Sequence, residues 1–388
     1  MSFRTPLALV AAAIALAAVS TTVGAAAKVA EASDAYCVFV TRPDGAGFRF
    51  LARGVGASWN PDGSSLAVGF VDASELGTLA SGTRLIRRTG ELIRELPETD
   101  RGWIDAKRLL VLGDGGDSYS VVYLDGRPPR LLRAPPLEEP WSAVAVASRA
   151  RLIVVAGTRT SDLWFDGTML VFLNADGRVV ATARYPRSTL TGVSPDGRRI
   201  AMTWEYHVAS RDTRVGPRNG RSVSLVSVAA SELVWSRDSM KLAVALQVTG
   251  SDMHATPANA GLYVHDVRRK RSFRRILRHR MISGVNWSPS GTRVAYYADG
   301  ALFTAPVAGG ASTRIARRAK GATWSPDGTR ITYASGGAIF TARAAGGESR
   351  RITPHAGYAN PAWSPDGRLI AFTRFPSDTP SMTPCPTE

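Results

Sequence analysis

Short apolar segments separated by polar turns recur along most of the chain. Thr329–Ala334 alternates between polar and apolar residues, and Arg368–Thr373 is a short apolar run bounded by turn residues. Both patterns are typical of β-strands. We therefore expect a protein built mainly from short strands joined by tight turns.

One short phrase lies next to many of these strands. It reads W-S-P-D-G at Trp324 and again at Trp363. In such a turn proline presets φ, aspartate accepts hydrogen bonds from the backbone ahead of it, and glycine supplies a positive φ. Each phrase therefore predicts a β-hairpin. Looser copies begin at Trp59, Val193, Trp235 and Trp287.

The recurrence assigns structural roles to the tryptophans and aspartates. The tryptophan is expected at the end of a strand, where its ring fills the space between neighbouring sheets. The aspartate is expected as a turn residue and not as part of a catalytic carboxylate pair. The residues concerned are Trp59, Trp103, Trp235, Trp287, Trp324 and Trp363, with Asp62, Asp196, Asp327 and Asp366.

Two weaker copies, at Trp103 and Val146, complete a regular series. Successive copies begin 37 to 52 residues apart. A second hairpin follows in most units, which gives four strands per unit. The unit beginning at Val193 shows only one clear later strand, Ser222–Val228. A period of about 40–45 residues with several strands indicates a β-propeller blade.

These units resemble the TolB-type propeller repeat, a bacterial relative of the WD-repeat blade. The resemblance rests on the W-S-P-D-G phrases and on later strands that follow a glycine, as at Gly261–Tyr263 and Gly337–Phe340. It covers residues 36–376. It implies a propeller fold and protein–protein contact at the cell envelope, although propellers host many functions.

The two chain ends are expected to complete one blade together. Tyr36–Thr41 and Phe48–Ala52 form a hairpin before any phrase, whereas the last phrase, Trp363–Arg374, has no second hairpin. Pairing between them would hide two sheet edges. We therefore predict an all-β propeller of eight four-stranded blades, closed by the N-terminal strands, with seven blades as the alternative.

The N-terminal residues predict export. Residues 1–27 read as a signal peptide, with a positive charge at Arg4, an apolar stretch over Leu7–Val19 and small residues at Ala25–Ala27. Residues 28–35 are expected to be a leader and residues 377–388 a proline-rich tail. The protein is then periplasmic, attached to the envelope or extracellular; a retained membrane anchor is the alternative.

The two cysteines lie near opposite ends of the chain, at Cys37 and Cys385. In an exported protein such a pair predicts a disulfide, which here would tie the closing blade. Two free thiols are the alternative.

The chain is strongly basic, with a formal net charge of +16. Four consecutive cations, Arg268, Arg269, Lys270 and Arg271, are expected in a turn on the same face as the Pro-Asp-Gly turns. They form a candidate anion-binding surface. Outside the cell its ligand would be an anionic lipid or envelope polymer and not nucleic acid. A general richness in arginine is the alternative explanation.

Long insertions are expected on the opposite face, where binding sites often lie. Four of the five histidines, His207, His254, His279 and His355, are expected there too, as scattered surface residues and not as a metal site. The insertions are Val71–Gly82, Thr158–Gly167, Trp204–Arg221 and Val248–Ala260.

Common enzyme signatures are missing from the sequence. It contains no G-x-S-x-G nucleophile motif, no P-loop and no dinucleotide fingerprint. We therefore predict no catalytic residue, metal ligand or cofactor. The sequence favours an exported binding module for a protein, a peptide or an envelope polymer, of undetermined oligomeric state. The alternative is a metal-dependent lyase or hydrolase with a site over the central channel.

Overall fold

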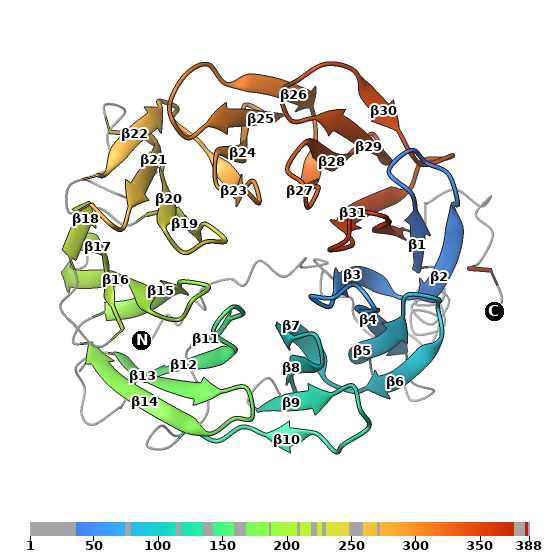
Figure 1. The fold of residues 1–388 in the computed structure, drawn as a ribbon, viewed down its shortest axis with the longest axis horizontal. Helices are drawn as coiled ribbons and strands as arrows, with labels where there is room; N and C mark the ends of the chain where they lie inside the picture. The colour runs from blue at the N-terminus through green and yellow to red at the C-terminus, as the bar shows by residue number, and fades with distance from the viewer. Residues whose placement is uncertain are drawn as a thin grey trace, which may run out of the picture.

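The computed structural model shows a ring of eight antiparallel sheets, each with four strands (Figure 1). The predicted eight-bladed all-β propeller is confirmed, and the seven-bladed alternative is wrong. Over the described residues there is no helix of the length and apolarity needed to cross a membrane. The structure describes residues 36–73, 79–113, 118–134, 143–158, 168–185, 188–207, 210–218, 223–226, 230–247, 259–269, 272–375 and 385–386.

Seven blades use four consecutive strands, of which the first lies nearest the ring centre (Figure 1). Blade 1 contains β3 (Val55–Trp59), β4 (Ser65–Ala73), β5 (Leu79–Arg87) and β6 (Leu92–Leu96). Blade 2 contains β7 (Thr99–Asp105), β8 (Arg108–Leu112), β9 (Tyr119–Tyr123) and β10 (Arg130–Leu131). Blade 3 contains β11 (Ala143–Ala147), β12 (Leu152–Thr158), β13 (Thr168–Asn174) and β14 (Val179–Tyr185).

The next four blades continue round the ring. Blade 4 contains β15 (Ser188–Val193), β16 (Arg199–His207), β17 (Ser210–Pro217) and β18 (Val223–Val226). Blade 5 contains β19 (Glu232–Trp235), β20 (Lys241–Leu246), β21 (Gly261–Asp266) and β22 (Arg274–Leu277). Blade 6 contains β23 (Ser283–Trp287), β24 (Arg293–Ala298), β25 (Ala301–Pro306) and β26 (Thr313–Arg317). Blade 7 contains β27 (Lys320–Trp324), β28 (Arg330–Ser335), β29 (Ala338–Arg343) and β30 (Ser349–Arg351).

Blade 8 joins the two ends of the chain, as predicted. Its strand order is β2-β1-β32-β31, so the N-terminal strand β1 pairs with the last strand β32. The Cys37–Cys385 disulfide adds a covalent link beside this pairing, with Cα atoms 5.8 Å apart. The strands are β31 (Tyr358–Trp363), β32 (Ile370–Arg374), β1 (Cys37–Thr41) and β2 (Arg49–Arg53).

The apolar core lies between blades and within them, not in one central mass. Between blades 8 and 1, for example, Val38 and Val40 of β1 pack with Leu66 and Val68 of β4. Burying one such side chain stabilises the fold by about 2 kcal/mol. Because the blades contribute apolar side chains to the interfaces on both sides, each blade covers apolar surface of its neighbours around the ring.

Four tryptophans of the repeated phrase also link blades by hydrogen bonds. The Trp287 indole N–H donates to the Val234 carbonyl of blade 5, at 2.8 Å. In each case the acceptor carbonyl belongs to the preceding blade. It is that of the residue directly before the copy of the phrase in that blade. The other bonds are Trp59 to Ala362, Trp103 to Ser58 and Trp324 to Asn286. The buried indole nitrogens of Trp235 and Trp363 have no partner within the described residues.

The aspartates of the phrase organise the turn between the first two strands. Ser325 donates to Asp327 Oδ1 at 2.5 Å, and the backbone N–H of Thr329 donates to the same oxygen at 3.0 Å. Gly328 has φ of 72°, as this turn requires. Similar bonds surround Asp196 and Asp366, while Asp62 accepts the N–H of Ser64. We call the face with these turns the Pro-Asp-Gly face.

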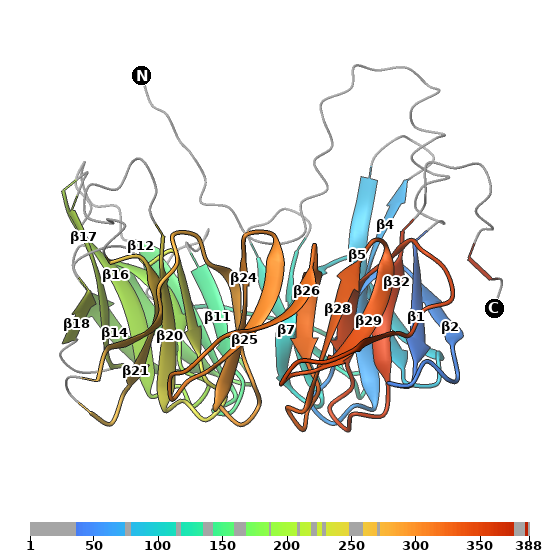
Figure 2. The same cartoon turned by 90° about the horizontal axis from the view of Figure 1, so that it is seen from above.

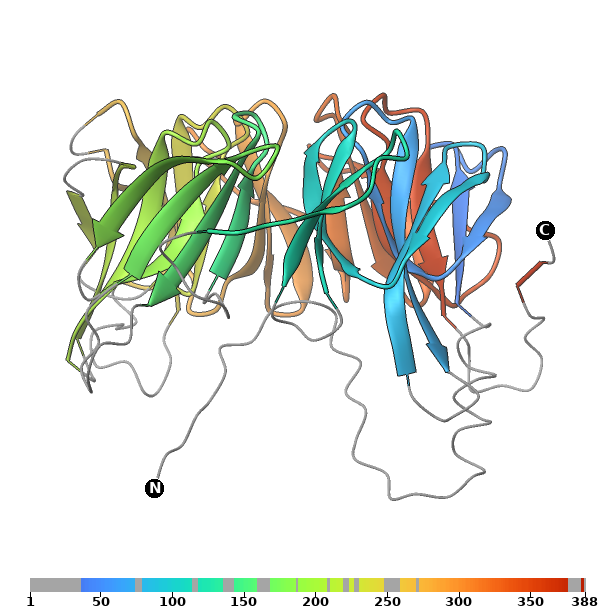
Figure 3. The ribbon, with the colours of Figure 1, turned by 90° about the horizontal axis from the view of Figure 1, so that it is seen from below.

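Two of the expected insertions are instead largely strands. In blade 4, β16 and β17 occupy most of Trp204–Arg221, so this blade has all four strands. Strand β17 was not predicted from the sequence because polar residues interrupt its apolar pattern. In the structure Thr213 and Val215 of this strand are nevertheless buried. In blade 1, β4 and β5 likewise extend into Val71–Gly82. Both hairpins project from the face opposite the Pro-Asp-Gly turns (Figures 2 and 3).

We predict that the indole hydrogen bond stabilises the inter-blade contact measurably. Trp287→Phe keeps an aromatic ring but removes the donor to Val234, so it should lower the free energy of unfolding by about 1–2 kcal/mol more than Trp363→Phe. Trp363 is the matched control because its indole nitrogen has no partner in the described chain. Urea unfolding measures both variants, and equal losses would contradict the prediction.

We predict that the disulfide stabilises the closed ring through the unfolded chain. It joins residues 348 positions apart, and closing a loop of this size lowers the entropy of the unfolded chain by an amount worth about 5 kcal/mol of stability. The double variant Cys37→Ala/Cys385→Ala should therefore unfold at a lower urea concentration. Dithiothreitol should lower the midpoint of the native protein but not that of the variant. A native midpoint insensitive to reduction would refute this role.

Candidate functional site

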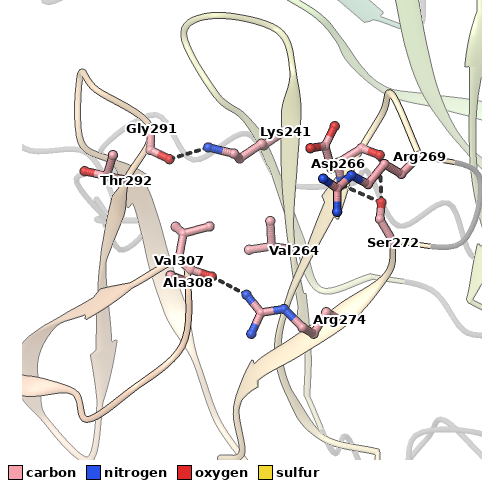
Figure 4. A pocket seen from close by; sticks show the side chains of 10 residues that line it. All are labelled: Lys241, Val264, Asp266, Arg269, Ser272, Arg274, Gly291, Thr292, Val307 and Ala308. Carbon is pink, nitrogen blue, oxygen red and sulfur yellow. Dashed lines mark hydrogen bonds between the residues drawn. The ribbon is translucent and has the colours of Figure 1, made fainter.

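A pocket of about 350 Å³ opens on the Pro-Asp-Gly face, between blades 5 and 6 (Figure 4). Blade 5 contributes Lys241 at the start of β20, Arg274 at the start of β22, and Arg269 and Ser272 from the turn between β21 and β22. Blade 6 contributes its first turn and the end of β25. The pocket therefore lies between the sheets and not over the central channel.

Two of its cations hold the neighbouring blade. Lys241 Nζ donates to the Gly291 carbonyl at 2.9 Å, and Arg274 Nη2 donates to the Val307 carbonyl at 2.5 Å. Each bond uses one N–H group, so both cations keep further donors. Arg269 differs, because within the described residues its guanidinium forms no hydrogen bond or ion pair. It is the cation of this pocket best able to accept a ligand.

The one carboxylate that lines the pocket, Asp266, is already neutralised. Arg268 donates to both of its oxygens, at 2.9 and 2.6 Å. These hydrogen bonds lower the pKa of Asp266 to about 2, against a smaller opposing effect of burial. The backbone of Asp266 is held by Ser272, which donates to its carbonyl at 2.7 Å. Charge on Arg269, Lys241 and Arg274 is therefore left for a ligand.

At two other inter-blade interfaces on the Pro-Asp-Gly face, arginines are paired with carboxylates. Arg88 of blade 1 pairs with Asp366 of blade 8 at 2.6 Å. Arg108 of blade 2 pairs with Asp105 and with Asp176 of blade 3, both at 2.6 Å. At the interface of blades 5 and 6, by contrast, no carboxylate in the described chain is paired with Lys241 or Arg274.

The sequence identified part of this site. Arg268 and Arg269 lie in the expected turn on the Pro-Asp-Gly face, with Arg268 bound to Asp266 and Arg269 in the pocket. Lys270 and Arg271 lie outside the described residues. Sequence reasoning missed Lys241, although it occupies the position of Arg293 and Arg330 in other copies of the phrase. That shared position is the signal that could have found it.

A second pocket, of about 360 Å³, lies on the opposite face where blades 5, 6 and 7 meet. Met281, Tyr297, Asp299 and Ala319 are among the residues that line it. Beside it, His279 Nε2 lies 3.0 Å from Asp299 Oδ2. This pocket is independent of the cations on the Pro-Asp-Gly face.

The histidines are not gathered into a metal site in the part of the chain described here. No cluster of three or more His, Cys, Asp or Glu side chains able to hold a metal ion occurs among these residues. His265 is buried within β21, and burial lowers its pKa. His254 and the side chain of His207 lie outside the description, as do most of Thr158–Gly167 and Val248–Ala260.

Comparisons with solved structures identify the fold. The β-propeller domain of the trilobed protease from Pyrococcus furiosus matches with a TM-score of 0.51 and 13% identity, over 77% of this chain and 98% of that one. A structure described as the eukaryotic initiation factor matches with a TM-score of 0.50 and 11% identity, over 81% and 96%. The protease propeller is described as having an open velcro topology, whereas blade 8 closes the present ring with strands from both chain ends.

A structure described as a candidate TolB from Agrobacterium tumefaciens has a TM-score of 0.42 and 13% identity, over 88% of this chain and 99% of that one. No protein-family model matches the chain, and no curated protein matches it. Similarity at these identities shows the propeller fold alone. Function must therefore be argued from the sites.

Proposed function

We propose that the protein is an exported, non-catalytic binding module that holds an acidic group of a peptide or envelope polymer between blades 5 and 6. The observation that carries this proposal is the guanidinium of Arg269, which has no hydrogen bond or ion pair within the described residues and lies beside Lys241 and Arg274. Arginine donates two parallel hydrogen bonds to carboxylate or phosphate, and charge-assisted bonds of this kind are stronger than neutral ones.

The pocket supplies further contacts for such a group. Thr292 places a hydroxyl group on its wall, and Lys241 adds a second type of cation. A volume of about 350 Å³ accommodates one acidic group with the atoms next to it. The rest of a longer partner would then run across the Pro-Asp-Gly face. A protein or an acidic envelope polymer fits this arrangement, and no cofactor is required.

Export is supported by two independent features. The apolar N-terminal stretch with its small residues is typical of a signal peptide. The Cys37–Cys385 disulfide is typical of an oxidising compartment such as the periplasm or the cell exterior. Such a location favours an envelope polymer or envelope protein over nucleic acid as the partner.

We predict that Arg269→Ala weakens binding of fluorescein-labelled oligoglutamate by about three- to tenfold at low ionic strength. Fluorescence anisotropy measures this, with polyphosphate as a competitor to compare phosphate with carboxylate. Arg343→Ala is the control, because Arg343 is exposed at the end of β29 on the same face and lines neither described pocket. Equal losses in both variants would indicate an effect of net charge and would refute the site.

We predict that the secreted form lacks residues 1–27. Intact-mass spectrometry of protein recovered from outside the cytoplasm should show a chain that begins near Lys28, with the mass of an oxidised cysteine pair. A full-length mass in the membrane fraction would support a retained anchor instead. A full-length, reduced protein in the cytoplasm would contradict export.

A further inference from the structure

Five exposed cations lie in the two connections that border the pocket on the opposite face. Arg278 and Arg280 lie in the connection between β22 and β23, while Arg317, Arg318 and Lys320 lie where β26 leads into β27. The pocket is lined by residues from both connections, Met281 from the first and Ala319 from the second. We call these five residues the basic patch. It is separate from the pocket on the Pro-Asp-Gly face.

The charge of the basic patch is not compensated. Within the described residues, none of its five side chains forms a hydrogen bond or an ion pair. The one carboxylate that lines the pocket, Asp299, lies 3.0 Å from His279 Nε2 and offsets at most one of the five positive charges.

One member of the patch occupies a strained backbone position. Arg318 has φ of 51°, a left-handed conformation that glycine adopts at lower energy. Its N–H donates to the Gly300 carbonyl at 2.7 Å, which fixes the turn. Replacing Arg318 with glycine therefore removes the cation without straining the turn.

The pocket is lined by both apolar and polar residues, the polar ones being Gln247, Ser283, Tyr297 and Asp299. Ile282, Ala298 and Ala319 are buried, whereas Met281 is 54% exposed. The Tyr297 hydroxyl accepts the backbone N–H of Ala322 at 2.7 Å. Burial raises the pKa of Tyr297, so its own proton remains available to donate. One apolar side chain of a ligand, next to a backbone carbonyl, fits this environment.

We propose that this face docks an acidic segment of a partner protein, with one apolar side chain in the pocket and carboxylates on the basic patch. Among the described residues, Met281 is the one exposed large apolar side chain near the pocket; the others lie on the outer strands of blades 1 to 3. A membrane surface is less well matched, because insertion into a bilayer needs several apolar side chains together. A purely anionic polymer would leave the pocket unfilled.

The test uses two fluorescein-labelled peptides and the full-length mature protein. Both peptides consist of aspartate and glutamate around one central residue, which is leucine in the first and glycine in the second. The leucine peptide should bind at least about tenfold more tightly, since only it fills the pocket. Equal affinity for the two peptides would overturn the proposal.

Two variants locate the binding surface. Arg318→Gly should weaken binding of the leucine peptide by about three- to tenfold while leaving the urea midpoint unchanged or higher, because glycine relieves the positive φ. Arg280→Ala should weaken binding similarly. Arg343→Ala is the control and should leave this binding unchanged, because Arg343 is exposed on the Pro-Asp-Gly face and lines neither pocket. Full affinity in Arg318→Gly and Arg280→Ala would refute the assignment.

Other ligands give distinguishable outcomes. Cosedimentation with phosphatidylglycerol vesicles that is lost in Arg318→Gly, without peptide binding, would assign the patch to membranes and overturn the peptide proposal. Tighter binding of polyphosphate than of the leucine peptide, again dependent on Arg318, would assign it to an anionic polymer. Arg269→Ala tests the pocket on the Pro-Asp-Gly face, and Arg318→Gly tests the basic patch. The two proposals can therefore fail independently of each other.

Discussion

The fold depends on contact between neighbouring blades. A single four-stranded sheet exposes two apolar faces, and each is covered only when the next blade packs against it. The indole N–H of Trp287 and its counterparts add a polar bond across these contacts, because a buried donor requires a partner. The repeated phrase thus serves two purposes, closing a hairpin within its own blade and joining that blade to the preceding one.

The same interfaces explain where the candidate sites lie. Cations on the Pro-Asp-Gly face generally tie adjacent blades, as Arg88 does with Asp366 and Arg108 with Asp176. Between blades 5 and 6 the cations bind carbonyl groups instead of carboxylates, and their positive charge remains. A small change in partner therefore leaves positive charge at this interface, which is the basis of the anion-binding proposal. The rest of the ring need not change for this to happen.

The sequence was most informative where local chemistry determines structure. The Pro-Asp-Gly turns and the position of each tryptophan predict the blades, and the unpaired hairpins at the chain ends predict the closing pairing of β1 with β32. Strand β17 could not be predicted because its polar residues carry no alternating apolar signal. The two pockets could not be predicted either, since they join residues such as Gln247, Met281 and Ala319 that approach one another only across blade interfaces. Arg318 shows the same limit, because a positive φ is visible only in the folded chain.

The strand pairing in blade 8 also constrains the order in which the protein can fold during synthesis. Synthesis begins at the N-terminus, so β1 and β2 are made first and β32 is made last. The hairpin of β1 and β2 can therefore join its sheet only after nearly the whole polypeptide has been made. Throughout that interval one edge of β1 remains open to any other extended strand, a hazard for aggregation during synthesis or passage across a membrane. The closing sheet therefore cannot form until the final strand of the chain has been made.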